Sequence, residues 1–307
     1  MSYYNNLEIR DFLKNKIDQT SLSEDKIIES LENCYKNCAF STFPYIMHNL
    51  DSKDAIEKYN SGNCIGLSMY LKDYLKSKYN ITSYLIPGTI PNKYKFEGYL
   101  DISHVVLAIP KNNNEIFIAD PAFYFLNPIK VDLYNNSPTT VFAKEIYNTE
   151  KNQYLKDYNT IDTIIANTRV LSKKTTFNKY QTIPEDTIVS EVYYKSDPYD
   201  KWTYFLKEIV NPDRAISDFF IGIRKDPFIM TTLIDKNGIC KGNGYFNLNS
   251  NGFVKIAEKD NDRNTYHILN IPSKEINIAK KFTKKYFKGN FDNYLKRFKN
   301  KYNSNII

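Results

Sequence analysis

The chain has 307 residues, of which 42% are hydrophobic and 25% charged, and it contains 26 tyrosines and 19 phenylalanines. This composition is typical of a globular protein long enough for two or three domains, and it excludes an intrinsically disordered chain. The formal net charge of +7 is concentrated in residues 280–301, where nine lysines and arginines accompany one acid, Asp292; the rest of the chain therefore carries −1. Because no run of about 18 apolar residues is present, the sequence predicts no membrane-spanning helix.

The cysteine content and the N-terminal residues indicate the compartment. Four cysteines are too few for a disulfide scaffold in a chain of this size. The first residues lack a basic stretch followed by an apolar one, so we expect a cytoplasmic protein. Cys34 and Cys38 lie four residues apart on a predicted helix, a spacing that favours packing over metal binding, and we expect no metal site.

Residues 1–86 are predicted to form a helical domain. Apolar residues at helical spacing indicate two amphipathic helices, with Ser21 or Ser23 as the N-cap of the second. The first helix is marked by Leu7, Phe12 and Ile17, and the second by Ile27, Ile28, Leu31 and Tyr35.

A glycine turn in this domain leads into a helix that begins at or next to Cys64 and ends near Tyr79. Ser61 or Asn63 is positioned to cap the first amides of this helix. A thiol at the helix N-terminus lies at the positive end of the helix dipole, which favours the thiolate. A nucleophilic cysteine requires this environment, although a buried packing cysteine would fit the same pattern.

Residues 87–200 are predicted to form a β-rich domain that contains a β-hairpin. Two apolar, β-branched runs flank the turn 110–114, and a turn centred on Asn112 places Ile109 opposite Glu115 and His104 opposite Asp120. Directly opposite residues have Cβ atoms about 5 Å apart, close enough for a carboxylate to hold an imidazole. The strands predicted in this domain, including the two of the hairpin, are at 103–109, 115–120, 139–142, 161–170 and 187–195. One more strand is predicted at 82–86, just before the domain.

Residues 201–307 are predicted to form an α/β domain. Trp202 opens a short helix at 201–209, and an antiparallel meander follows with strands at 228–234, 244–248, 253–257 and 265–271. The basic tail alternates lysines with aromatic residues and is expected to be an amphipathic helix with a solvated basic face. Lysines of this tail could also bind an anionic ligand or, less readily, nucleic acid.

Cys64, His104 and Asp120 together match the pattern of an activated nucleophile, with a base to take the thiol proton and a carboxylate to orient the base. Their order and spacing resemble those of arylamine N-acetyltransferases, which belong to the transglutaminase-like and papain-like cysteine superfamily. Residues 43–50 lie where that family carries its segment before the cysteine, and residues 224–228 resemble the start of its third domain.

This resemblance implies an α+β fold of the cysteine-proteinase-like type. It would have a helical bundle that carries the cysteine, a central antiparallel β-barrel-like domain, and a lid of a small antiparallel sheet plus a helix. It also implies that an acetyl group passes from acetyl-CoA through a Cys64 thioester to an aromatic amine, hydrazine or amino sugar. No permanently bound cofactor is implied. We expect Asn63 and Phe123 beside the triad, as contributors to an oxyanion site, and Lys284, Lys285 and Lys288 as candidates to bind the phosphates of coenzyme A.

Two alternatives remain at this stage. Residues 60–63 keep only one glycine where the family has Arg-Gly-Gly, and residues 121–123 replace its glycine-rich turn after the aspartate. These differences favour a transglutaminase-like amidase or peptidase that uses the same triad. A non-catalytic binding protein with a basic tail is the other alternative. We expect small-molecule partners, no membrane, and no nucleic acid.

Overall fold

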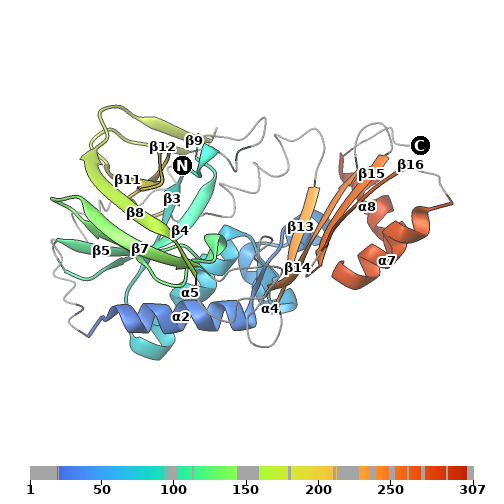
Figure 1. Ribbon diagram of the computed structural model, residues 1–307, viewed down its shortest axis with the longest axis horizontal. Coiled ribbons are helices and arrows are strands. Elements are labelled where there is room, and N and C mark those ends of the chain that lie inside the picture. The colour runs from blue at the N-terminus through green and yellow to red at the C-terminus, as the bar shows by residue number, and fades with distance from the viewer. Residues whose placement is uncertain are drawn as a thin grey trace.

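The computed structural model describes residues 19, 21–92, 95, 102–112, 114–143, 159–178, 181–209, 212, 228–234, 240–248, 253–260, 263–270, 274–287 and 290–302. It contains helices, an eight-stranded sheet and a four-stranded sheet, which confirms the predicted α+β class (Figure 1). The first predicted helix and Lys288 lie outside the described residues. Within the described residues, no helix is long and apolar enough to cross a membrane.

The helical part of the chain surrounds the helix that begins at Cys64. The helices are α2 (Glu24–Asn37), α3 (Phe43–His48), α4 (Ser52–Tyr59) and α5 (Cys64–Tyr79), and α2 and α4 both pack against α5. The bounds of α5 confirm the prediction. Helices α3, α4 and α5 each end at an asparagine with positive φ, a conformation that asparagine adopts more readily than most residues; these are Asn49, Asn60 and Asn80.

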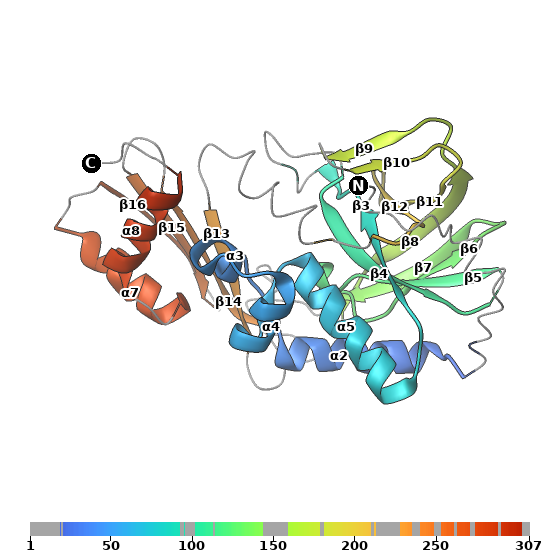
Figure 2. The same cartoon turned by 180° about the vertical axis from the view of Figure 1, so that it is seen from behind.

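Eight antiparallel strands form the central sheet, in the order β6-β5-β4-β3-β12-β11-β8-β7 (Figures 1 and 2). Their bounds are β3 (Tyr84–Gly88), β4 (His104–Pro110), β5 (Glu115–Ala119), β6 (Ile129–Asp132), β7 (Ser137–Ala143), β8 (Asn159–Val170), β11 (Ile188–Tyr194) and β12 (Asp197–Phe205). Strands β9 (Thr175–Asn178) and β10 (Gln181–Ile183) form a separate hairpin.

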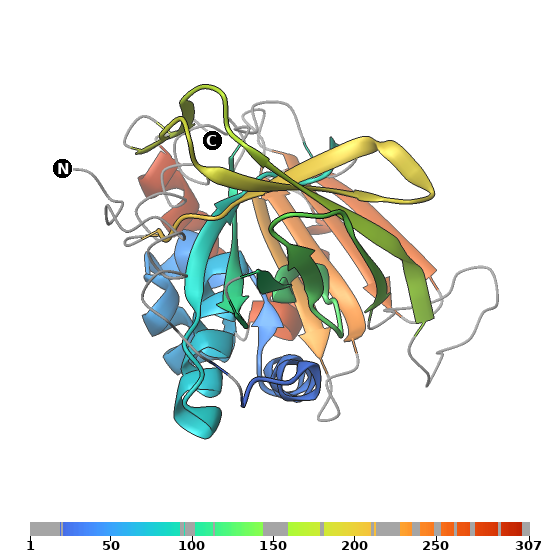
Figure 3. The same cartoon turned by 90° about the vertical axis from the view of Figure 1, so that its left-hand side faces the viewer.

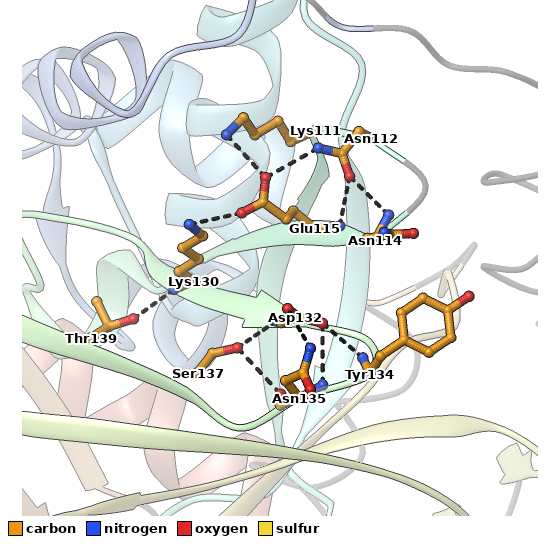
Figure 4. Close-up of polar contacts among 10 residues, drawn as sticks. All are labelled: Lys111, Asn112, Asn114, Glu115, Lys130, Asp132, Tyr134, Asn135, Ser137 and Thr139. Atoms are coloured by element: carbon orange, nitrogen blue, oxygen red, sulfur yellow. Dashed lines mark hydrogen bonds and ion pairs between the residues drawn. The ribbon is translucent and has the colours of Figure 1, made fainter.

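The central sheet curves until its two end strands, β6 and β7, lie side by side (Figure 3). Side chains of β7 close the gap: Thr139 Oγ1 accepts from the Lys130 amide at 3.0 Å, and Ser137 Oγ accepts from the Asp132 amide at 2.6 Å (Figure 4). The sheet is therefore barrel-like, as the resemblance implied. Closure also protects the edges that an open sheet would expose.

Both faces of β4 are buried, so its sequence lacks the alternation of apolar and polar residues. Val105, Leu107 and Ile109 pack in a core shared with the helices, whereas Val106 and Ala108 pack in the interior of the barrel. Helix α5 lies on the helical side of this strand.

The register predicted for the β4–β5 hairpin is wrong by two residues. Ile109 pairs with Phe117 rather than with Glu115, and the ladder ends at the pair Leu107–Ala119. The reason is the turn: Asn112 Oδ1 accepts from the amides of Asn114 and Glu115, which places the turn one residue later. Because an even shift keeps each side chain on its original face, the faces of the strands are as predicted.

The helix predicted at 201–209 is also wrong. Residues 197–205 form β12, which pairs with β11 along its length and meets β3 at Tyr204 and Gly88. The strand is set by these non-local partners, which override the helix that the local sequence predicted. Trp202 is nevertheless buried, in the barrel interior. Strands β3 and β12 lie across the predicted limits at residues 86 and 200, and the division into domains 1–86, 87–200 and 201–307 stays a prediction.

The C-terminal part is an antiparallel meander backed by two helices. It comprises β13 (Phe228–Ile234), β14 (Cys240–Leu248), β15 (Phe253–Asp260), β16 (Arg263–Asn270), α7 (Ile276–Phe287) and α8 (Phe291–Tyr302). The basic tail thus forms two helices rather than one, and Asn290 Oδ1 accepts from the first amides of the second helix. The apolar side of α3 belongs to the same core: Phe43, Ile46 and Met47 pack with residues of the meander and of both helices.

Candidate active site

The nucleophile turn, residues 60–66, connects α4 to α5. Its strand β2 (Ser61–Gly62) pairs with β1 (Ala39–Phe40), and Asn63 then has an extended backbone before Cys64 opens the helix. Asn63 Oδ1 accepts from the amides of Ile65 at 3.0 Å and of Gly66 at 3.3 Å. This cap leaves the amide of Cys64, the first of the helix, available to a ligand, because the first amides of a helix have no acceptor within it.

His104 is brought to Cys64 by the packing of α5 against β4. Ser68 Oγ, one turn beyond Cys64, donates to the carbonyl of Val105 at 3.3 Å. The Cys64 side chain interacts with the His104 ring and helps to raise the pKa of that ring. Both residues are shielded from solvent, with exposed fractions of 5% for Cys64 and 4% for His104.

Asp120 holds the other side of the imidazole. His104 Nε2 and Asp120 Oδ2 are 2.7 Å apart, and because the carboxylate can only accept, Nε2 carries the proton. Since Nε2 is used in this way, Nδ1 is the ring nitrogen left for the thiol. The predicted contact between His104 and Asp120 is therefore present, although Asp120 lies just beyond the ladder rather than opposite His104.

Two further groups orient the Asp120 carboxylate, which is fully buried. The Tyr204 hydroxyl donates to Oδ2 at 2.9 Å, and the Phe123 amide, in the single-turn helix η2 (Pro121–Phe123), donates to Oδ1 at 3.4 Å. The Phe123 ring also lies beside the His104 ring, with their centroids 5.1 Å apart. Phe123 thus lies beside His104, and its contribution to an oxyanion site stays a prediction.

Glycine at position 88 makes room for this arrangement. Gly88 pairs with His104 on one side and with Tyr204 on the other, so the three residues lie across three neighbouring strands. A Cβ at Gly88 would lie 3.0 Å from Tyr204 Cδ1 and 3.2 Å from the carbonyl of Thr203. Only glycine therefore lets Tyr204 approach Asp120 without displacing the strand.

The electrostatics of the site favour a charged imidazole. Burial by itself lowers the pKa of His104, but the charge of Asp120, its hydrogen bond and the Cys64 side chain outweigh burial and raise this pKa to about 10. Protonated imidazole beside the sulfur stabilises a thiolate. Because folding raises the pKa of His104, the charged imidazole also stabilises the folded state. This contribution to stability is fully present below pH about 6.5 and is lost as the pH rises through about 10.

The lysines predicted to bind coenzyme A lie elsewhere in the structure. Lys284 and Lys285 belong to α7, at the end of the molecule away from the eight-stranded sheet and beyond β13–β16 (Figures 1 and 2). Lys285 forms an ion pair with Glu258 and lies over the Tyr286 ring. The structure does not bring these two lysines together with the triad, and their role stays a prediction.

Tyr204 and Tyr45 lie at this site, although neither was predicted to do so. Tyr204 was assigned to a helix, although Trp202 and Tyr204 alternate with Lys201 and Thr203 in the manner of a strand. Tyr45 lies on α3, eighteen residues before Asn63, and its hydroxyl accepts from the Asn63 amide at 3.1 Å. No local pattern indicates this contact, because it depends on how α3 packs.

No protein-family model and no curated protein matches the sequence. Among solved structures, the chain is similar to an arylamine N-acetyltransferase from Bacillus cereus that is described with a Cys-His-Glu triad. The identity is 14%, the match covers 86% of this chain and 90% of the other, and the TM-score is 0.49.

Two further structures give similar values. Arylamine N-acetyltransferase C from Bacillus anthracis matches at 14% identity, with 92% and 99% of the two chains covered and a TM-score of 0.47. The enzyme from Mycobacterium marinum, in complex with CoA, matches at 11% identity, with 91% and 93% covered and a TM-score of 0.45. These three solved structures are arylamine N-acetyltransferases, the class that the spacing of the Cys, His and Asp residues of this chain resembles.

Proposed function

We propose that the chain is a cysteine-dependent acyltransferase in which Cys64 is the nucleophile, His104 the base and Asp120 the group that orients the base. The observation that carries this proposal is the buried His104 ring, which Asp120 holds at 2.7 Å on Nε2 and which lies on β4, the strand that packs against the helix of Cys64. A thiol, an imidazole and a carboxylate in this order are the parts of an activated cysteine nucleophile.

The first half-reaction forms the acyl-enzyme. The proton of Cys64 resides on His104 Nδ1, as the raised pKa of His104 favours, and the Cys64 thiolate attacks the carbonyl carbon of the acyl donor. The resulting oxyanion is positioned to accept from the Cys64 amide, which the Asn63 cap leaves available. When the tetrahedral intermediate collapses, the bond to the leaving group breaks, the leaving group takes the proton from His104, and the acyl group remains on sulfur as a thioester.

The second half-reaction transfers the acyl group to an amine. The amine nitrogen attacks the thioester carbonyl and gives its proton to His104, and the carbon–sulfur bond then breaks to regenerate Cys64. The low exposure of Cys64 and His104 supports transfer over hydrolysis, because a thioester shielded from water persists until the amine arrives.

The identity of the two substrates follows the sequence resemblance. We propose acetyl-CoA as the donor and an aromatic amine, hydrazine or amino sugar as the acceptor. Coenzyme A is a thiol, so the first half-reaction exchanges one thioester for another of similar free energy. The second half-reaction exchanges that thioester for an amide, and neither step needs an external energy source.

A second candidate function is a transglutaminase-like amidase that acts through the same three residues. The turn after Asp120 favours it: Pro121–Phe123 forms a single-turn helix whose Phe123 ring packs beside His104, where the resemblance called for a glycine-rich turn. This candidate would form the same thioester from a glutamine or peptide amide. It differs from the first in its donor, so the two can be separated by experiment.

The test is the intact mass of the protein after brief incubation with acetyl-CoA. We expect the wild type to gain one acetyl group and Cys64→Ala to gain none. The matched control is Cys34→Ala, which removes a buried thiol outside the site and should keep the adduct. Absence of the adduct in the wild type, with rapid alkylation of Cys64 by iodoacetamide at pH 6, would exclude acetyl-CoA and leave the amidase. Alkylation no faster than that of an ordinary thiol would contradict both candidates.

A further inference from the structure

The hydroxyl of Tyr45 lies directly beneath the nucleophile turn. It accepts from the amide of Asn63, the residue before Cys64, at 3.1 Å. It also shares a hydrogen bond with Ser52 Oγ at 2.9 Å. The Asn63 amide must donate in the first bond, whereas either hydroxyl can donate in the bond between Tyr45 and Ser52, which lies at the first turn of α4. Tyr45, Ser52 and Asn63 are all buried, so water does not offer a replacement partner.

Two glycines of the nucleophile turn accommodate this hydroxyl. A Cβ at either Gly62 or Gly66 would lie 3.0 Å from Tyr45 Oη, which is closer than ordinary van der Waals contact. These glycines stand two residues before and two residues after Cys64. The turn is therefore built around the Tyr45 hydroxyl on both sides of the nucleophile. Neither glycine has a positive φ, so glycine is needed here because it lacks a Cβ, which allows the Tyr45 hydroxyl to approach the backbone closely.

Tyr45 is itself held by the C-terminal part of the chain. Its neighbours on α3, namely Phe43, Ile46 and Met47, pack in the core formed by the four-stranded sheet and α7 and α8. Helix α3 thus presents an apolar side to that core and a hydroxyl to the nucleophile turn. A rigid α3 fixes the position of the hydroxyl, and the hydroxyl in turn fixes the backbone that enters α5.

We infer that Tyr45 is a positioning residue for Cys64, which sets the alignment of the thiol with His104 by holding the Asn63 amide. This inference rests on the proposed function, because it takes Cys64 as the nucleophile. Without the hydroxyl, the buried Asn63 amide loses its acceptor, and the turn shifts to find another. Cys64 is the next residue, so its sulfur moves relative to the imidazole, and small displacements of a reacting group are costly.

The test is the pH profile of Cys64 alkylation by iodoacetamide, followed by peptide mass on the full chain. This readout needs no acyl donor or acceptor. In Tyr45→Phe we expect the alkylation rate at pH 6 to fall about tenfold and the rise of the rate with pH to move to higher pH, as a looser contact with the imidazolium predicts.

The matched control is Tyr286→Phe, which removes the hydroxyl of an equally buried tyrosine. Tyr286 lies on α7, and its exposed fraction is 8%, against 7% for Tyr45. Its hydroxyl donates to Glu258 Oε1 at 2.8 Å. We expect this control to lose a similar amount of thermal stability while it keeps the wild-type pH profile. A merely structural role of Tyr45 would give both variants the same unchanged profile, and that result would overturn the inference.

Gly66→Ala is the second variant, and it leaves the tyrosine in place. The added methyl pushes on the hydroxyl, so we expect the same change of profile as in Tyr45→Phe, and no further change when the two are combined. Alkylation of Gly66→Ala at the wild-type rate would refute the inference even if Tyr45→Phe does not fold. A wild type that reacts no faster than an ordinary thiol would instead refute the proposed function, and the inference with it.

Discussion

Replacing Asp120 by Asn tests the electrostatic basis of the site. Asn keeps the size of the side chain and removes its charge, in a position that is fully buried. Asp120 is the main cause that raises the pKa of His104 to about 10, and burial of the ring opposes it. Without that charge, only the Cys64 side chain still opposes burial, and we expect the pKa of His104 to fall to its usual value of 6.5 or below.

The size of the effect follows from this shift. It exceeds three pKa units, each of which corresponds to about 1.36 kcal/mol and a factor of ten in proton affinity. Allowing for relaxation of the buried pair, we expect Cys64 in Asp120→Asn to react with iodoacetamide about 10²- to 10³-fold more slowly at pH 6, because the imidazolium that stabilises the thiolate is lost. The amide also favours the wrong tautomer of His104, which lowers acyl transfer further.

The assay is the alkylation rate of Cys64 between pH 5 and about 9, with thermal unfolding as the check on the fold. Asp132→Asn is the matched control, since the Asp132 carboxylate accepts from the amides of Tyr134 and Asn135 in an exposed turn (Figure 4). We expect the control to react like the wild type. If folded Asp120→Asn also reacted at the wild-type rate at pH 6, the argument that Asp120 charges the imidazole would be refuted.

Two further predictions concern Tyr204 and Glu115. In Tyr204→Phe, the Asp120 carboxylate loses a 2.9 Å hydrogen bond, and we expect urea titration to show a free energy of unfolding lower by about 1–3 kcal/mol; a change within the error of the titration would contradict this. Glu115 pairs with Lys130 at 2.7 Å and Lys111 at 3.0 Å, which lower its pKa to about 2 (Figure 4). Its side chain is 21% exposed and its lysines more so, so solvent screening reduces the expected loss in Glu115→Gln to about 1 kcal/mol at pH 7. A lowered pKa stabilises the fold above pH 4.5 and ceases to do so as the pH falls towards 2, so the stability difference between wild type and variant should shrink across that range; a difference independent of pH would exclude this ion pair as its cause.

The sequence alone determined the local parts of the site. A capping residue, a cysteine and an apolar helical stripe follow one another within a few residues, and α5 begins at Cys64 as predicted. The two apolar runs of the hairpin likewise predicted β4 and β5, and the contact between His104 and Asp120 survived an error in register. The contact between His104 and Asp120 is still present because the register differs from the predicted one by two residues. Side chains of a strand alternate between its faces with a period of two, so each of these residues keeps its predicted face.

Only the tertiary structure decided the parts that depend on distant partners. Tyr204 reaches Asp120 because β12 pairs with β3 and β11, whereas the local sequence predicted a helix at 201–209. Tyr45 reaches the nucleophile turn because the other side of α3 is buried against the C-terminal sheet and helices. Pairing between strands and packing between helices are settled by partners far along the chain, and the short patterns in a sequence do not record which partner a segment will meet.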